Sequence, residues 1–210
     1  MVNVKISKSD QLAIIRQKII DEMKCPLKDA ATNLVFGKGN PEAKIFFIGE
    51  APGKNEDLQG EPFVGQAGKQ LDELLKLIDL SLEKVYIANI LKYRPPENRA
   101  PTKEEIIRHT PYLVEQIHSI QPEIIITLGN YATKFVLAHF NPEQMKTVTG
   151  IAQLHGIPVE QTIQGKTYTI IPMYHPAAIL YNRGLQKTVE EDFKKTGNYL
   201  HTIEEKNRNV

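Results

Sequence analysis

The amino-acid sequence predicts an α/β fold with three layers, in which helices cover both faces of a central, mostly parallel four-stranded sheet. Four short runs rich in Ile, Val, Phe and Tyr are typical of strands buried on both faces. Stretches with helical periodicity lie between these runs, and this alternation is typical of α/β proteins. A chain of 210 residues with 41% hydrophobic content can bury one sizeable core. We therefore expect a single domain over residues 1–210.

The apolar runs and the periodic stretches give the expected elements in order. Thr102, followed three residues later by Glu105 and preceded by Pro101, indicates a capped helix start. The glycines between residues 147 and 166 indicate an irregular excursion or a hairpin. We expect a helical lead-in over about residues 1–40 and a flexible tail over 201–210. The expected strands are 43–49, 84–91, 123–128 and 168–174, and the expected helices are 10–24, 65–78, 102–120, 130–139 and 186–200.

Composition and charge narrow the classes of protein to consider. The sequence has no apolar run of about 18 residues, and its start, MVNVKISKSD, lacks the apolar block of a secretory signal. We expect a soluble, cytoplasmic protein without a membrane partner. The net charge of +1 gives no overall attraction to nucleic acid, so any such affinity must come from local patches. The single cysteine, Cys25, excludes an internal disulfide and a four-thiolate metal site within one chain.

Ligands of open parallel sheets bind outside the carboxyl ends of the strands. The segments that follow the four expected strands are rich in Gly, Pro and side chains that form hydrogen bonds; they are 49–53, 89–96, 129–130 and 175–178. Such residues at four strand ends together predict one shared site, although each motif alone more often has a purely structural role.

The first of these segments, GEAPGKNED, carries two acids, Glu50 and Glu56, six positions apart. Its glycines bring backbone amides close to a ligand, whereas the phosphate-loop patterns GxxxxGK[ST] and GxGxxG are absent from the sequence. We interpret it as a candidate catalytic loop. The loop residues expected to contact a ligand are Gly49, Ala51, Pro52 and Gly53.

Three further side chains have properties that suit a planar base. Phe63, between Pro62 and Gly65, can offer a ring face for stacking. Asn89, at the end of a strand, offers an acceptor and two donors that match the edge of uracil, while cytosine presents the opposite pattern. His175 is delivered by the last strand into a Pro-Ala-Ala turn.

The sequence resembles the uracil-DNA glycosylase superfamily, most closely its family 4, from about residue 25 to residue 200. The matching strings, in the order of the family, are NLVFGKGNPEAKIFFIGEAPG, EPFVGQAGKQLDELL, VYIANILKYRPPENRAPT and YHPAAIL. The resemblance implies an enzyme that flips uracil out of DNA, hydrolyses its glycosidic bond and leaves an abasic site.

The resemblance also implies a role for each matching residue. Glu50 and Glu56 would shape the pocket and position the attacking water, and Phe63 would stack on the flipped base. Asn89 would bind the uracil edge, and His175 would donate to a base carbonyl as the leaving ring becomes an anion. The expected DNA contacts are the basic residues Lys92, Arg94, Arg99 and Arg183, together with Leu180 and Tyr181 as candidate wedges.

Family 4 usually holds a 4Fe-4S cluster on four cysteines, and here the corresponding positions are Glu22, Cys25, Tyr93 and His109. Because such clusters are held mainly by thiolates, we expect no cluster, no other cofactor and no metal. We expect packing to hold this region, with Tyr93 hydrogen-bonded to Glu22 or His109. A zinc ion on Cys25, His109 and Glu22 is the alternative that ligand types alone allow.

Other functions remain open at this point. The pocket could accept another deaminated base, hypoxanthine or xanthine, or the chain could be a catalytically silent DNA-binding module. Lys54, beside the catalytic loop, raises the option of a lyase step through a Schiff base. We expect a monomer whose partner is uracil-containing DNA, single- or double-stranded.

Overall fold

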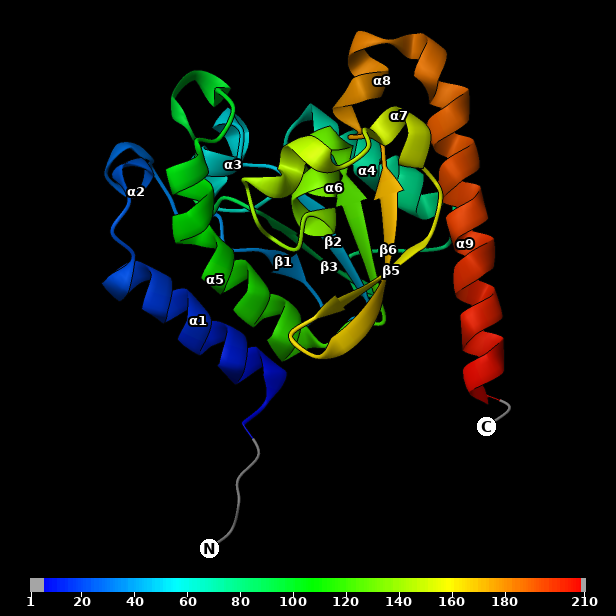
Figure 1. Cartoon of the computed structure of the whole chain (residues 1–210), viewed down its shortest axis with the longest axis horizontal. Coiled ribbons are helices and arrows are strands. Elements are labelled where there is room, and N and C mark those ends of the chain that lie inside the picture. Colours follow the sequence, from blue (N-terminus) through cyan, green and yellow to red (C-terminus); the bar gives the residue numbers. More distant parts are fainter. Residues whose placement is uncertain (1–5, 209–210) are drawn as a thin grey trace, which may run out of the picture.

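The computed structural model describes residues 6–208 and has the expected three layers around one mixed sheet (Figure 1). Six strands follow the order β1-β3-β2-β4-β6-β5, so the prediction of four strands is wrong. The four expected strands form the parallel centre, and the two others pair antiparallel at its edges. The strands are β1 (Lys38–Gly39), β2 (Ile45–Gly49), β3 (Val85–Asn89), β4 (Ile124–Leu128), β5 (Val159–Ile163) and β6 (Lys166–Met173).

The edge strands lack the apolar signal of the central ones for simple reasons. β1 has only two residues, and β5, with the sequence VEQTI, alternates between exposed and buried positions. A strand with one solvated face does not give a continuous apolar run. β5 and β6 form a hairpin. A hairpin was one of the two alternatives that the sequence left open for this region, the other being an irregular excursion.

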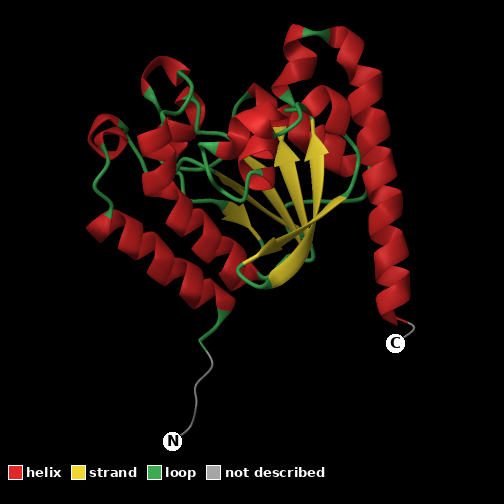
Figure 2. Ribbon diagram, viewed as in Figure 1, coloured by secondary structure: helices red, strands yellow, loops and turns green. Residues whose placement is uncertain are grey.

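Helices cover both faces of the sheet (Figure 2). One apolar cluster joins α1 (Lys8–Glu22), α5 (Lys103–Ile120) and α6 (Gly129–Leu137) to one face of the sheet. A second cluster joins α4 (Gln66–Lys76), α8 (Ala177–Tyr181) and α9 (Gln186–Arg208) to the other face. The short helices are α2 (Pro26–Ala30), α3 (Lys54–Gln59) and α7 (Ile151–Leu154), and the 3-10 turns are Pro96–Asn98, Gln144–Thr147 and Arg183–Leu185.

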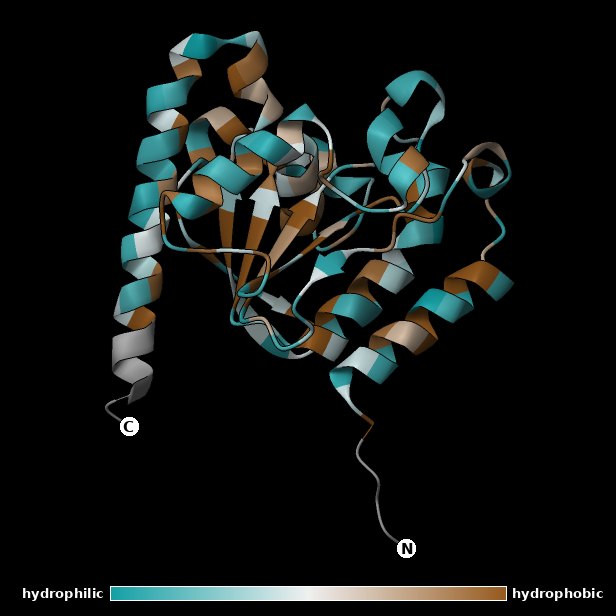
Figure 3. Cartoon of the chain, turned by 180° about the vertical axis from the view of Figure 1, so that it is seen from behind, coloured by the Kyte–Doolittle hydropathy of each residue, from teal (hydrophilic) through white to brown (hydrophobic). Residues whose placement is uncertain are grey.

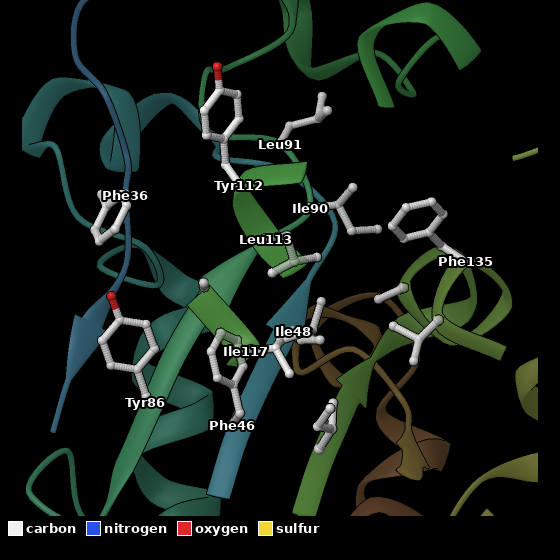
Figure 4. Packing of buried hydrophobic residues seen from close by; sticks show 14 of the residues in the cluster. Phe36, Phe46, Ile48, Tyr86, Ile90, Leu91, Tyr112, Leu113, Ile117 and Phe135 are labelled. Atoms are coloured by element: carbon white, nitrogen blue, oxygen red, sulfur yellow. The ribbon is translucent and has the colours of Figure 1, made fainter. Parts of the chain in front are cut away.

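Successive residues of a strand point to opposite faces, and this places them in the two clusters alternately. In β2, Phe46 and Ile48 pack toward α5, while Ile45 and Phe47 pack toward α4 and α9. Figure 4 shows Leu113 of α5 directed at this face of the sheet, and Figure 3 shows the apolar strands lying between more polar helix surfaces. The continuous apolar runs of the sequence are thereby explained.

The ends of the chain differ in part from the expectation. The last helix does not stop at residue 200, as expected from the sequence, but continues to Arg208. The lead-in contains α1 and α2 as expected, but it also contributes β1 to the sheet. Residues 1–5 and 209–210 lie outside the described part. Within residues 6–208, no helix is both long and apolar enough to cross a membrane.

The capping box predicted for α5 is confirmed. The Thr102 side chain accepts a hydrogen bond from the Glu105 backbone N–H at 3.3 Å, and the Glu105 carboxylate accepts one from the Thr102 N–H at 2.8 Å. These bonds satisfy amides that the first helical turn leaves without partners. The box also anchors the loop that precedes α5, which borders the site described next.

Candidate active site

The carboxyl ends of β2, β3 and β6 open into one cavity of about 500 Å³. Glu50, Phe63, Asn89 and His175 all line it, so the structure brings together the residues that the sequence nominated from separate segments. Four further lining residues were not nominated individually from the sequence: Ala67, Pro95, Asn98 and Ala177. The remaining lining residues are Ala51, Pro52, Gly53, Glu56, Arg99 and Tyr181.

Phe63 is held in a backbone conformation that bulky residues rarely adopt, with φ at 52°. Its carbonyl oxygen accepts a hydrogen bond from Lys38 Nζ at 3.1 Å, and it lies so close to Gly68 that a Cβ there would be 2.0 Å away. Such strain persists only where the surroundings impose it. Neither Lys38 nor Gly68 was nominated from the sequence, because nothing in their local pattern signals this contact.

Glu56 braces the loop that carries Phe63. Its Oε1 accepts hydrogen bonds from the backbone N–H groups of Val64 at 2.9 Å and Gly65 at 2.8 Å. Its Oε2 faces Gly53, where a Cβ would lie 2.8 Å from it. One carboxylate oxygen therefore holds the loop that carries Phe63, while the other lies beside Gly53.

Asn89 and Phe63 meet above Gly49. A Cβ on Gly49 would lie 2.3 Å from Asn89 Oδ1 and 2.9 Å from the Phe63 ring, so only glycine leaves room for both groups. Asn89 is 2% exposed and lines the cavity. An amide at the wall of a cavity can offer one acceptor and two donors to a ligand.

His175 is held in one tautomer and kept neutral. Its Nδ1 accepts a hydrogen bond from the Ala177 N–H at 3.2 Å, so the ring proton lies on Nε2 and can be donated. Burial lowers the pKa of His175 to about 4, against the smaller opposing effect of the Glu56 carboxylate. The ring stacks on Phe63 with centroids 5.7 Å apart, and Gly129 packs against its Cβ.

Glu50 contributes a carboxyl group in a partly buried setting. Burial raises its pKa above the ordinary value, which makes the carboxylate a stronger base than an exposed glutamate. It follows Gly49 directly and lines the same cavity as His175. The site thus combines a half-buried acid with a neutral imidazole donor.

The basic residues nominated for DNA contact differ in their surroundings. Lys92 is fully buried and its Nζ donates inward, so the prediction that it contacts DNA is wrong. Arg99 is exposed, but its guanidinium is bound by both oxygens of Glu105, at 2.9 and 2.5 Å. This pairing lowers the pKa of Glu105 to about 2. Arg94 is partly buried and donates to Asn98 in the same loop at 2.7 Å.

The segment after His175 presents apolar groups beside the cavity. Tyr181 is 91% exposed and lines the cavity rim, and Leu180 is 46% exposed. Arg183 follows in the exposed 3-10 turn. Two large, exposed apolar side chains therefore lie next to each other in this segment.

The four positions that correspond to cluster cysteines do not fit an iron-sulfur cluster. Cys25 is the single thiol, and Glu22 is exposed while the other three positions are buried. Tyr93 contacts His109 through an edge-to-face ring arrangement, with centroids 6.1 Å apart, in place of the predicted hydrogen bond. His109 Nε2 is buried without a hydrogen-bond partner. Among the described residues, no group of three or more His, Cys, Asp or Glu is arranged to hold a metal ion.

The chain is similar in sequence to known proteins. Residues 36–201 match the model of the uracil DNA glycosylase superfamily. The chain is 46% identical to the type-4 uracil-DNA glycosylase of Archaeoglobus fulgidus, over 90% of this chain and 92% of that protein. It is 37% identical to the type-4 uracil-DNA glycosylase of Thermotoga maritima, over 92% and 97% of the two chains. The chain therefore belongs to the uracil-DNA glycosylase superfamily.

Proposed function

We propose that this protein excises uracil from DNA by hydrolysing its N-glycosidic bond, releasing the free base and leaving an abasic site. The observation that carries the proposal is the convergence of Glu50, Phe63, Asn89 and His175 on one cavity at the carboxyl ends of three parallel strands. The type-4 relatives, at 37 to 46% identity over most of the chain, support it.

Recognition uses the ring of Phe63 and the amide of Asn89. A flipped pyrimidine stacks on Phe63, while Asn89 accepts from the base N–H and donates to the adjacent carbonyl. Cytosine offers an acceptor and a donor at these positions, which would leave both buried amide groups without partners. Unpaired polar groups in a dry site are costly, and this discriminates against cytosine.

The chemical step separates charge, and the site has a partner for each sign. The bond between the base nitrogen and C1′ breaks with its electron pair moving into the uracil ring, while positive charge develops on the sugar. The Nε2–H of His175 and backbone N–H groups of the loop 49–53, in which Pro52 has none, stabilise the base anion. Glu50 stabilises the sugar cation, orients water and accepts its proton as the water oxygen bonds to C1′.

The DNA itself is bound beside α8. Tyr181, with Leu180, enters the gap that the flipped nucleotide leaves, and Arg183 contacts a phosphate. Arg94 and Arg99 face the strand from the loop that precedes α5, where Glu105 offsets much of the charge of Arg99. We propose that the protein acts as a monomer, on single- or double-stranded DNA.

We further propose that the chain carries out this reaction without an iron-sulfur cluster. A cluster would need four cysteines, but Cys25 is the single thiol and the rings of Tyr93 and His109 contact each other at two of the other positions. Iron and acid-labile sulfide analysis of protein purified without oxygen tests this directly. Stoichiometric iron with visible absorbance would contradict it.

The activity is tested with an oligonucleotide containing one uracil, followed by alkaline cleavage of the abasic product. We expect the wild type to release uracil, His175→Ala to be slower by on the order of 100-fold, and Asn89→Ala by at least about tenfold. His118→Ala, an exposed histidine of α5 outside the cavity lining, is the matched control and should retain the wild-type rate. A wild type that leaves uracil intact but releases hypoxanthine or xanthine would show a glycosylase for another deaminated base, and one that releases none would show a binding module.

A further inference from the structure

Lys92 is completely buried, which is rare for a lysine without a carboxylate partner. Its Nζ donates to two neutral oxygens, the Asn89 carbonyl at 2.8 Å and Gln116 Oε1 at 2.6 Å. None of the ion pairs among the described residues includes Lys92. Burying an ammonium group in this way is costly, and a leucine or methionine would pack at lower cost. Packing alone therefore does not explain a buried lysine at this position.

The backbone polar groups of Lys92 are also engaged. Its backbone N–H donates to His109 Nδ1 at 2.9 Å, and its carbonyl accepts from the Val35 N–H at 2.9 Å. Gln116 is itself fixed, because its Nε2 donates to the Phe36 carbonyl at 3.0 Å. Gln116 and His109 both belong to α5, so Lys92 links the end of β3 to this helix.

The opposite side of the same segment is bonded to the catalytic loop. The Ile90 N–H donates to the Gly49 carbonyl at 2.9 Å, and the Leu91 N–H donates to the Glu50 carbonyl at 3.1 Å. Residues 89–92 therefore lie between the first motif and α5, with hydrogen bonds in both directions. Rotation of the peptide after Asn89 would break bonds on both sides.

This arrangement bears on Asn89 because its carbonyl and its side chain share one Cα. The Nζ of Lys92 fixes the carbonyl, and the amide oxygen occupies the space beside Gly49 that a Cβ would fill, since an added Cβ would lie 2.3 Å from it. A displacement of about 1 Å in a positioning contact can lower a rate on the order of 100-fold. The orientation of the amide is thus sensitive to the bond that Lys92 makes.

We infer that Lys92 is a positioning residue for base recognition: through the Asn89 carbonyl, and supported by Gln116 and His109, it holds the Asn89 amide in the orientation that binds the uracil edge. The inference rests on the proposed function, and it assigns to Lys92 a role inside the protein in place of the DNA contact that its sequence neighbourhood indicates. Lys92 acts through Asn89 and does not contact the base.

A double-mutant cycle tests this dependence. Lys92→Met retains the aliphatic volume and removes both donors, and we expect it to lower the single-turnover rate of uracil release by about tenfold or more. Combined with Asn89→Ala, it should cause no further loss, because its effect is transmitted through the missing amide. Leu113→Ala, a core change on the same helix as Gln116 and His109, should instead have an effect that multiplies with that of Asn89→Ala. A folded Lys92→Met protein with the wild-type rate, or a fully multiplicative double variant, would overturn the inference.

A pair of substitutions at Gln116 covers the case in which Lys92→Met does not fold. Both substitutions remove the Nε2 donor to the Phe36 carbonyl, but Gln116→Glu keeps an oxygen that accepts from Lys92, whereas Gln116→Leu does not. We therefore expect Gln116→Glu to release uracil at least about threefold faster than Gln116→Leu. Equal rates for the two variants would contradict a role for this hydrogen bond.

Amide hydrogen exchange at Ile90 and Leu91 supplies a readout that does not require activity. Lys92→Met should accelerate exchange at these two amides more than Leu113→Ala does, because their segment loses the Nζ bonds to the Asn89 carbonyl and to Gln116 of α5. Unchanged exchange would refute the bracing role even in a protein that releases no uracil. If the wild type releases no uracil but amide exchange is faster in Lys92→Met, the proposed function is contradicted and the bracing role of Lys92 is not.

Discussion

The rings of Phe63 and His175 stack with their centroids 5.7 Å apart and their planes inclined by 29°. Phe63 lies in the loop before α4, and His175 follows β6, so residues more than a hundred positions apart form one wall of the cavity. The stacked pair combines a flat apolar face with a donor fixed at Nε2. This geometry suits a planar base that becomes an anion as it leaves.

Gly49→Ala should abolish recognition while leaving the fold intact. The added Cβ would lie 2.3 Å from Asn89 Oδ1 and 2.9 Å from the Phe63 ring, and it can be accommodated only by displacing both recognition groups. We expect the single-turnover rate to fall on the order of 100-fold. Gly150→Ala is the control, because its Cβ would meet no atom closer than 3.4 Å. A Gly49→Ala protein with the wild-type rate would show that the pocket floor tolerates a methyl group.

His175 should remain neutral well below the ordinary pKa of histidine. Because burial lowers its pKa to about 4, the imidazole keeps its free donor at Nε2 throughout the neutral and mildly acidic range. NMR titration of the His175 ring should show no protonation at pH 6 and a midpoint near 4. A midpoint near 6.5 would mean that the ring is exposed and would contradict the donor role assigned here.

The buried His109 should make the protein sensitive to acid. Its folded pKa is lowered to about 3 by burial and by the nearby Lys92, whereas the unfolded chain binds a proton near 6.5. The unfolded state therefore takes up a proton as the pH falls below 6.5, and the free energy of unfolding decreases by about 1.4 kcal/mol per pH unit until about pH 3. Urea unfolding of wild type and His109→Asn between pH 7 and 4.5 measures this. The variant should show a shallower decline, and parallel declines would contradict the assignment.

Tyr181→Ala should slow uracil release from duplex DNA more than from single strands. The side chain is 91% exposed on the cavity rim, so its removal leaves the fold unstrained but removes a group that can fill the gap in the base stack. We expect a loss of about tenfold on duplex and a smaller loss on single-stranded substrate. Ile107→Ala, at an exposed apolar position of α5 outside the cavity lining, should affect neither. Equal losses on both substrates would argue against a wedge.

Much of the fold follows from local patterns in the sequence. The four central strands are continuous apolar runs because both of their faces are buried, and Thr102 with Glu105 signals the start of α5 because the capping box is a local structure. The position of the site was predictable for a related reason: the carboxyl ends of parallel strands share one edge of the sheet. Glu50 and His175 come just after such strands and Asn89 ends one, and the structure places the three together.

Only the tertiary structure decided the features that depend on distant neighbours. Lys92 lies in the sequence among Arg94, Arg99 and Lys103, a pattern typical of an exposed basic face, and its burial follows from the packing of α5 over the end of β3. β1 and β5 form because existing strands offer them free edges. Short-range sequence patterns report on burial and chain direction, whereas the partner of a polar group is set by chain segments brought close only on folding. The sequence alone therefore determined the fold class and the groups at the strand ends, and the tertiary structure decided which of those groups face the cavity and which brace it from behind.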